Sequence, residues 1–158
     1  MRGKRTAMSA ALAAGALAVT GLAFAPSAAA VTPQTATITA DCGIYGGGAA
    51  TLTATQTGTS ATITLSSSAV TVPIAVAQDS VASTLTMVKA SGGTTVFSGT
   101  KNPAMAAGSA VSVGPLSGTV ASGDSLEAHG GSLKMTVFGI TITCTATGNQ
   151  SPGPFVFD

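Results

Sequence analysis

The chain has 158 residues, a formal charge of +1 and only 7% charged residues, which is the size of one ordinary domain preceded by a short leader. Beyond that leader, residues 31–158 keep three lysines, no arginine and five acidic residues, a formal charge of −2. So few cations cannot neutralise many phosphates, which excludes nucleic-acid binding and attachment to anionic membranes through a polybasic patch.

The first thirty residues have the three parts of a secretory signal peptide. A basic start that ends at Arg5 is followed by an apolar, alanine-rich stretch over residues 7–24 and by a small-residue cleavage site at 28–30. We therefore expect residues 1–30 to be removed on export. Residues 31–158 then form a single secreted, extracellular domain with no stable membrane association.

Strict alternation of threonine with apolar residues predicts strands in the first part of this domain. Residues 35–42 alternate without a break, as do residues 50–55 and 61–65. Gly58 and Thr59 separate the last two segments, so residues 52–65 are expected to form a hairpin.

The second part of the domain continues in the same way, with strands that are short and often interrupted. Pro73 cannot donate a hydrogen bond, so the strand around it is expected at an edge or a bulge. Phe138-Gly139 is either a tight turn or a bulge. The expected strands are residues 70–76, 81–87, 94–97, 111–113, 116–120, 133–137 and 140–144, with a loop at 101–108 and an extended tail at 148–158.

This pattern of eight or nine short strands, with no helical periodicity after the leader, predicts an all-β fold. Frequent turn signals favour an antiparallel, immunoglobulin-like β-sandwich. A closed barrel is the main alternative.

The two cysteines are predicted to form one disulfide. Cys42 lies in the first expected strand and Cys144 in the last, both on the apolar parity, and two cysteines in an exported chain normally pair. Such a bond closes a loop of about 100 residues, which is worth about 4.7 kcal/mol in the chain-entropy model. This stabilisation matters here because the chain has no Trp and one Tyr, so its core is built from small side chains.

The residues that might carry chemistry are few. Asp124, Glu127 and His129 are the only close group of ionisable side chains, and the flanking glycines favour a polar turn between strands over a metal or acid–base site. The expectation is therefore no catalytic residue, no metal and no cofactor. The hydroxyl-rich surface, with 23 Thr and 15 Ser in residues 31–158, suits a neutral small molecule or an extracellular partner. Of the aromatic residues, Phe97 is expected in the core and Tyr45 over the end of a sheet.

Several tracts, among them residues 92–99, 102–108, 114–120 and 150–155, resemble small secreted actinobacterial β proteins of unknown function. Composition and size also resemble the neocarzinostatin-type apoproteins, which implies a secreted β-sandwich that carries a small molecule in a cleft. That family has two disulfides, whereas this chain has one possible pair. The expected function is thus non-enzymatic extracellular binding or structure, with a small-molecule carrier as the alternative and a hydrolase as a remote one.

Overall fold

The computed structural model describes residues 31–158, so the expected signal peptide lies outside the described residues. These residues form ten strands and one short 3-10 turn, and no helix among them is long and apolar enough to span a membrane. In chain order the elements are β1 (Val31–Thr32), β2 (Thr35–Asp41), η1 (Gly43–Tyr45), β3 (Gly47–Thr57), β4 (Ser60–Thr71), β5 (Ala82–Lys89), β6 (Thr94–Thr100), β7 (Ala110–Thr119), β8 (Ser125–Val137), β9 (Ile140–Ala146) and β10 (Phe155–Phe157).

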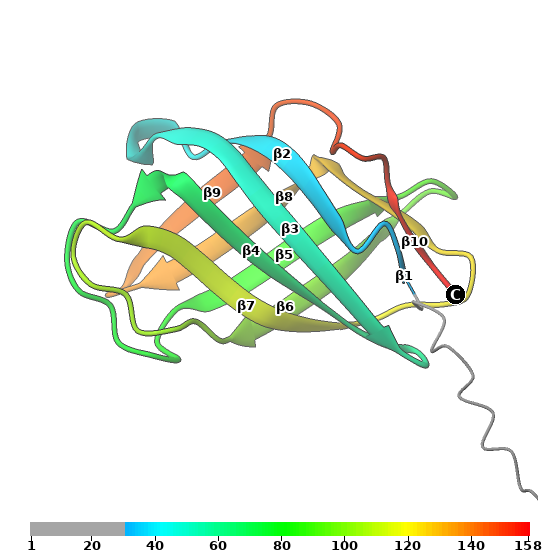
Figure 1. The fold of residues 1–158 in the computed structure, drawn as a ribbon, viewed down its shortest axis with the longest axis horizontal. Coiled ribbons are helices and arrows are strands. Elements are labelled where there is room, and N and C mark those ends of the chain that lie inside the picture. Colours follow the sequence, from blue (N-terminus) through cyan, green and yellow to red (C-terminus); the bar gives the residue numbers. More distant parts are fainter. Residues whose placement is uncertain (1–30) are drawn as a thin grey trace, which may run out of the picture.

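The strands are antiparallel and close into an eight-stranded barrel (Figure 1). The order β8-β5-β6-β7-β4-β3-β2-β9 returns to its start because β9 also pairs with β8. Strands β10 and β1 extend the sheet from the first residues of β8, where Phe155 pairs with Leu126. The all-β, antiparallel prediction is confirmed, while the immunoglobulin-like sandwich differs from the closed sheet that is observed.

The difference between sandwich and barrel rests on two weakly paired seams. Strands β6 and β7 share a single residue pair, Ser98 with Ser117, and β2 and β9 share two pairs at the end of β2. The remaining neighbours in the ring are paired over many residues, so the barrel consists of two four-stranded halves. A pattern of short alternating strands predicts these halves but carries no information about the seams.

Inward-facing residues alternate with hydroxyl-bearing outward ones, as the sequence pattern predicts. Leu52, Ile63 and Phe97 have 0% of their surface exposed, which confirms the interpretation of Phe97 as a core residue. Outside, Thr35, Thr53 and Thr64 lie side by side on three neighbouring strands. Hydroxyls such as these, rather than charges, make up the solvated surface of the barrel.

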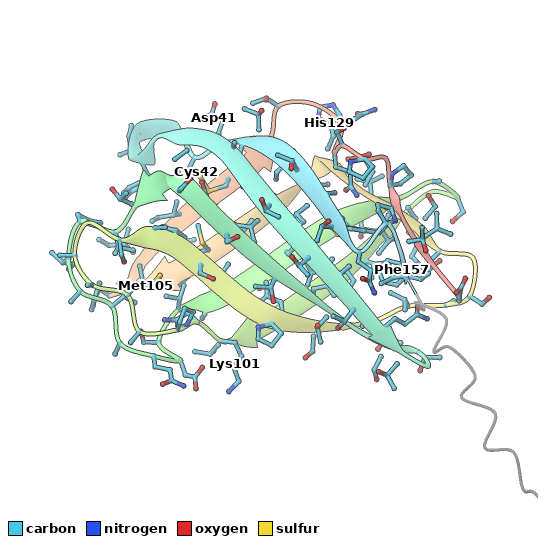
Figure 2. The ribbon with its side chains drawn as sticks, in the orientation of Figure 1. Asp41, Cys42, Lys101, Met105, His129 and Phe157 are labelled. Carbon is cyan, nitrogen blue, oxygen red and sulfur yellow. A yellow bond between two sulfur atoms is a disulfide. The ribbon has the colours of Figure 1, made fainter. Side chains whose placement is uncertain are left out.

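The two ends of the barrel are filled differently. At one end Phe155 and Phe157 of β10 are completely buried together with Leu126, so the expected extended tail contributes a strand and two core side chains. Figure 2 shows Phe157 at this end, whereas Cys42 and Met105 lie toward the opposite end. That opposite end holds the candidate site.

Three predicted segments differ from the observed ones. Residues 70–76 do not form a separate strand: β4 ends at Thr71, and Val76 makes one isolated bridge with Met105. The two segments predicted at 111–113 and 116–120 form one strand, Ala110–Thr119, that continues through Gly114-Pro115 with a shift in register opposite β4.

The third difference is at His129-Gly130-Gly131, which was expected as a turn and lies inside β8. The pairing of β8 with β5 shifts register here, and Gly130 has a φ of 86°. A Cβ on Gly131 would collide with the Thr86 carbonyl, so this bulge requires glycine.

Candidate ligand-binding cavity

The open end of the barrel contains an apolar cavity of about 360 Å³, called the mouth below. It lies between η1, the connection from β4 to β5, Met105, the start of β7 and the hairpin of β8 and β9. The residues around it are Cys42, Tyr45, Val70, Thr71, Val72, Pro73, Ile74, Val76, Val81, Met105, Val111, Met135, Val137, Phe138, Ile140 and Ile142.

The mouth exists because the inward-facing pattern continues beyond the packed core. Met135 pairs with Ile142 and Val137 with Ile140, so their apolar side chains extend the inner wall to the very end of β8 and β9. No plug such as the phenylalanines of β10 fills this end among residues 31–158. Ile140 therefore stays 51% exposed although it lies on the inward parity.

Exposed apolar side chains also surround the opening. Tyr45 is 45% exposed, Ile74 55% and Phe138 62%. Tyr45 was expected to cover the end of a sheet, and it lies at the rim of this opening. Large apolar side chains left in solvent around a concave apolar surface are typical of a binding site.

Phe138 occupies a backbone conformation that costs energy. With Gly139 it forms the two-residue turn between β8 and β9, which settles the sequence alternatives in favour of a tight turn, and its φ is 52°. Such turns favour Asn or Gly at this position, and a bulky side chain with positive φ is a strained outlier. The turn therefore holds an aromatic side chain at the rim at a cost in stability, which is common at functional sites.

The mouth carries no ionisable side chain other than the phenol of Tyr45 among the described residues that line it. Thr71 and Tyr45 supply its side-chain hydroxyls. A charged ligand group placed in this lining would lose its hydration without gaining a partner. The cavity accordingly suits an uncharged, largely apolar molecule.

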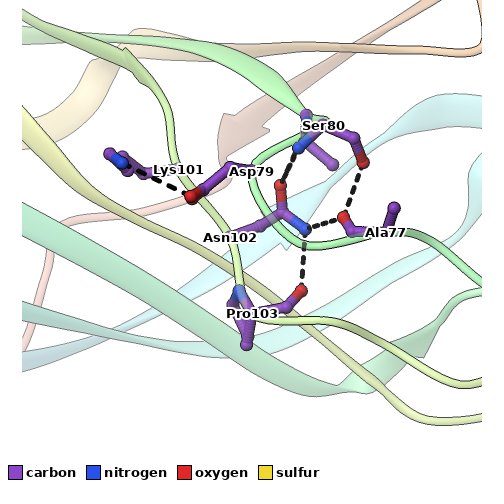
Figure 3. Close-up of polar contacts among 7 residues, drawn as sticks. Ala77, Asp79, Ser80, Lys101, Asn102 and Pro103 are labelled. Carbon is purple, nitrogen blue, oxygen red and sulfur yellow. Dashed lines mark hydrogen bonds and ion pairs between the residues drawn. The ribbon is translucent and has the colours of Figure 1, made fainter.

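One wall of the mouth is held in place by the buried side chain of Asn102 (Figure 3). Its Oδ1 accepts hydrogen bonds from the backbone N–H groups of Ser80 at 2.8 Å and Val81 at 2.9 Å. Its Nδ2 donates to the carbonyls of Ala77 at 2.8 Å and Pro103 at 2.7 Å. The amide thereby ties the connection between β4 and β5 to the loop after β6.

The predicted disulfide between Cys42 and Cys144 is confirmed, with a Cα–Cα distance of 4.1 Å. It follows directly after the pair Asp41–Thr145, the last pair of the seam between β2 and β9. The bond thus covalently closes one of the two weak seams, and Cys42 also contributes to the mouth.

The acidic residues and the histidine singled out in the sequence lie away from the mouth, and Figure 2 shows His129 far from Met105. His129 Nδ1 is 3.0 Å from the Ala146 carbonyl oxygen. Glu127 accepts hydrogen bonds from the backbone N–H groups of His129 and Gln150. Within residues 31–158 no three His, Cys, Asp or Glu side chains are placed to hold a metal ion.

Asp124 has a structural partner of its own. It accepts a hydrogen bond from the Ala121 backbone N–H at 2.9 Å and forms an ion pair with Lys89 at 3.0 Å. The Ala121 hydrogen bond is the main cause that holds the pKa of Asp124 below its ordinary 3.8; burial opposes the shift and Lys89 adds to it. The structure therefore separates Asp124 from Glu127 and His129 rather than joining them in one site.

Sequence reasoning did not find the mouth. Residues 70–76 were predicted as a strand because Val70, Val72, Ile74 and Val76 alternate, and Pro73 was the one signal that this segment leaves the sheet. Comparisons of the chain with family models, with curated proteins and with solved structures give no match. The resemblance to the neocarzinostatin-type apoproteins consequently rests on composition and size alone.

Proposed function

We propose that this protein is a non-enzymatic, secreted carrier that binds an uncharged apolar small molecule in the mouth of its barrel. The observation that carries the proposal is the apolar cavity of about 360 Å³, because small-molecule sites usually measure about 300–1,000 Å³. The exposed apolar rim and the strained turn at Phe138 support it further.

The same observations favour the carrier over the other functions that the sequence left open. A purely structural or adaptor protein has no need of an unfilled barrel end, because an empty apolar cavity makes the fold less stable than a packed one. A hydrolase that relied on His129 would need a nucleophile or carboxylate in the cleft, and His129 instead faces the Ala146 carbonyl away from the mouth.

Secretion is part of the proposal. The basic, apolar and small-residue order of residues 1–30 supports it, and the disulfide is consistent with an oxidising, extracellular compartment. N-terminal sequencing of the protein recovered from culture medium should begin at or near Val31. A protein that still begins with Met1 would contradict export by cleavage.

Binding can be measured with N-phenyl-1-naphthylamine, a neutral apolar dye that fluoresces when it leaves water. Tyr45 is the only tyrosine and the chain has no tryptophan, so Tyr45 is the donor for any energy transfer to the bound dye. We expect saturable binding of one dye per chain. Native mass spectrometry of protein secreted by its own host should show a stoichiometric small molecule.

A matched pair of variants tests whether the dye binds in the mouth. Ile140→Thr changes a β-branched residue that is 51% exposed in the mouth, and Val96→Thr changes one that is 48% exposed on β6 and does not line it. We expect Ile140→Thr to weaken dye binding severalfold and Val96→Thr to leave it unchanged. Equal effects of the two substitutions, or no saturable binding, would refute the proposal.

A further inference from the structure

We infer that the ligand has a slender, unbranched alkyl end that passes through the mouth into the interior of the barrel, with an uncharged group left at the rim. This inference rests on the proposed carrier function and specifies the chemical class of its ligand. It follows from a second, smaller cavity that continues from the mouth.

The inner cavity has a volume of about 40 Å³ and lies between the two halves of the barrel. Cys42, Val70, Val111 and Met135 line both this cavity and the mouth, so the two spaces are adjacent. Ala50, Ser67 and Leu133 are among the residues that line the inner cavity but not the mouth.

The inner cavity is narrow and largely apolar. One water-sized occupant needs about 10–15 Å³, so the space holds about three methylene-sized groups. Its buried hydroxyl, that of Ser67, already donates to the Ala49 carbonyl at 2.7 Å. A space lined in this way stays dry and takes apolar groups, and its small volume suits an alkyl end better than a ring or a branched group.

Met135 marks the passage between the two spaces. It is 8% exposed and lines both cavities. Its unbranched thioether side chain adapts to irregular space more readily than a branched one. An alkyl chain can therefore displace it without moving the strand.

The lining of the mouth determines the other end of the ligand. Thr71 and Tyr45 offer hydroxyls, and the described lining of the mouth provides no counter-charge for a carboxylate, phosphate or ammonium group. An uncharged amphiphile, such as a long-chain alcohol, combines a neutral hydroxyl with an alkyl chain of the required width.

The test is a series of linear alcohols from hexanol to dodecanol, measured by displacement of the naphthylamine dye from the intact protein. Each methylene that leaves water for the barrel should tighten binding about fourfold. Affinity should rise with chain length and then level off when the inner cavity is full.

Ala50→Val fills the inner cavity, because Ala50 is 3% exposed and lines that cavity but not the mouth. Ala49→Val is the matched control: it lies beside Ala50 on β3 but faces outward. We expect Ala50→Val to weaken dodecanol binding about tenfold and to leave hexanol binding and dye binding unchanged. Ala49→Val should bind the whole series as the unmodified protein does.

If Ala50→Val does not fold, Leu133→Val tests the inference in the opposite direction. Leu133 also lines the inner cavity alone, so the shorter side chain adds space there, and dodecanol should bind about fourfold more tightly with hexanol unchanged. Alcohols that bind without dependence on either variant would overturn the inner alkyl site and leave the carrier function standing. Failure of both dye and alcohols to bind would overturn the carrier function itself.

Discussion

Replacing Asn102 by alanine should destabilise the barrel and deform the mouth at the same time. The substitution removes four hydrogen bonds. Three of them join the connection of β4 and β5 to the loop after β6, and the fourth, to the Pro103 carbonyl, lies within that loop. The backbone N–H of Val81 is buried, and leaving it without an acceptor costs about 1–3 kcal/mol. The other three groups lie on exposed residues that water can reach, so each loses only about 0.5 kcal/mol.

These contributions predict that Asn102→Ala lowers the free energy of unfolding by about 3 kcal/mol. Urea denaturation followed by far-ultraviolet circular dichroism measures this loss, and Asn149→Ala, at an exposed asparagine, is the control. Dye affinity should fall as well, because Val76 and Val81 on the tethered connection line the mouth.

Asn102→Asp makes the prediction more specific. One carboxylate oxygen can still accept from the N–H groups of Ser80 and Val81. The other faces the carbonyls of Ala77 and Pro103, so the pKa of this aspartate should be raised above its ordinary value. A group with a raised pKa in the folded state contributes stability that is lost as pH rises, so this variant should regain stability in acid. If Asn102→Ala unfolds at the same urea concentration as Asn149→Ala, the tethering role of Asn102 is wrong.

Three further predictions follow from other contacts. Cys144→Ala should lower the free energy of unfolding by about 2–5 kcal/mol, and an unchanged melting temperature would contradict the role of the disulfide at the seam. Asp124→Asn should cost about 1 kcal/mol near neutral pH, and the difference from the unmodified protein should vanish in urea titrations at acid pH, because a carboxylate with a lowered pKa loses its contribution as pH falls through that pKa. Phe138→Asn should raise stability by about 0.5–1 kcal/mol and weaken dye binding; a lower melting temperature would show that the turn is not strained.

The sequence is sufficient to predict those strands in which alternation is unbroken and a turn signal marks the end. Thr35 to Cys42 and the hairpin through Gly58 follow from period-two alternation and a clear turn, and the disulfide follows from the parity of two cysteines. Closure of the barrel could not be predicted, because it depends on a few residue pairs such as Ser98 with Ser117. The sequence around these residues does not differ in kind from the sequence of a strand at the open edge of a sheet.

The mouth escaped prediction for a related reason. The alternation at Ile140 and Ile142 is the same whether other core side chains pack on the inner face or the face is left open. Alternation shows which face of a strand a residue occupies, but it does not show what fills the space next to that face. The burial of Phe155 and Phe157 shows the same limit at the other end. There, a tail rich in Pro and Gly places two aromatic residues inside the barrel.

The threonine rows on the outer face have a consequence for how quickly the proposed ligand would be captured. Residues 31–158 carry only eight charged side chains of Lys, Asp and Glu, so the electric field around the barrel is weak and long-range steering contributes little to encounter rates. An uncharged ligand is likewise unaffected by that field. The rate at which an uncharged ligand is captured should then depend little on ionic strength in dilute salt.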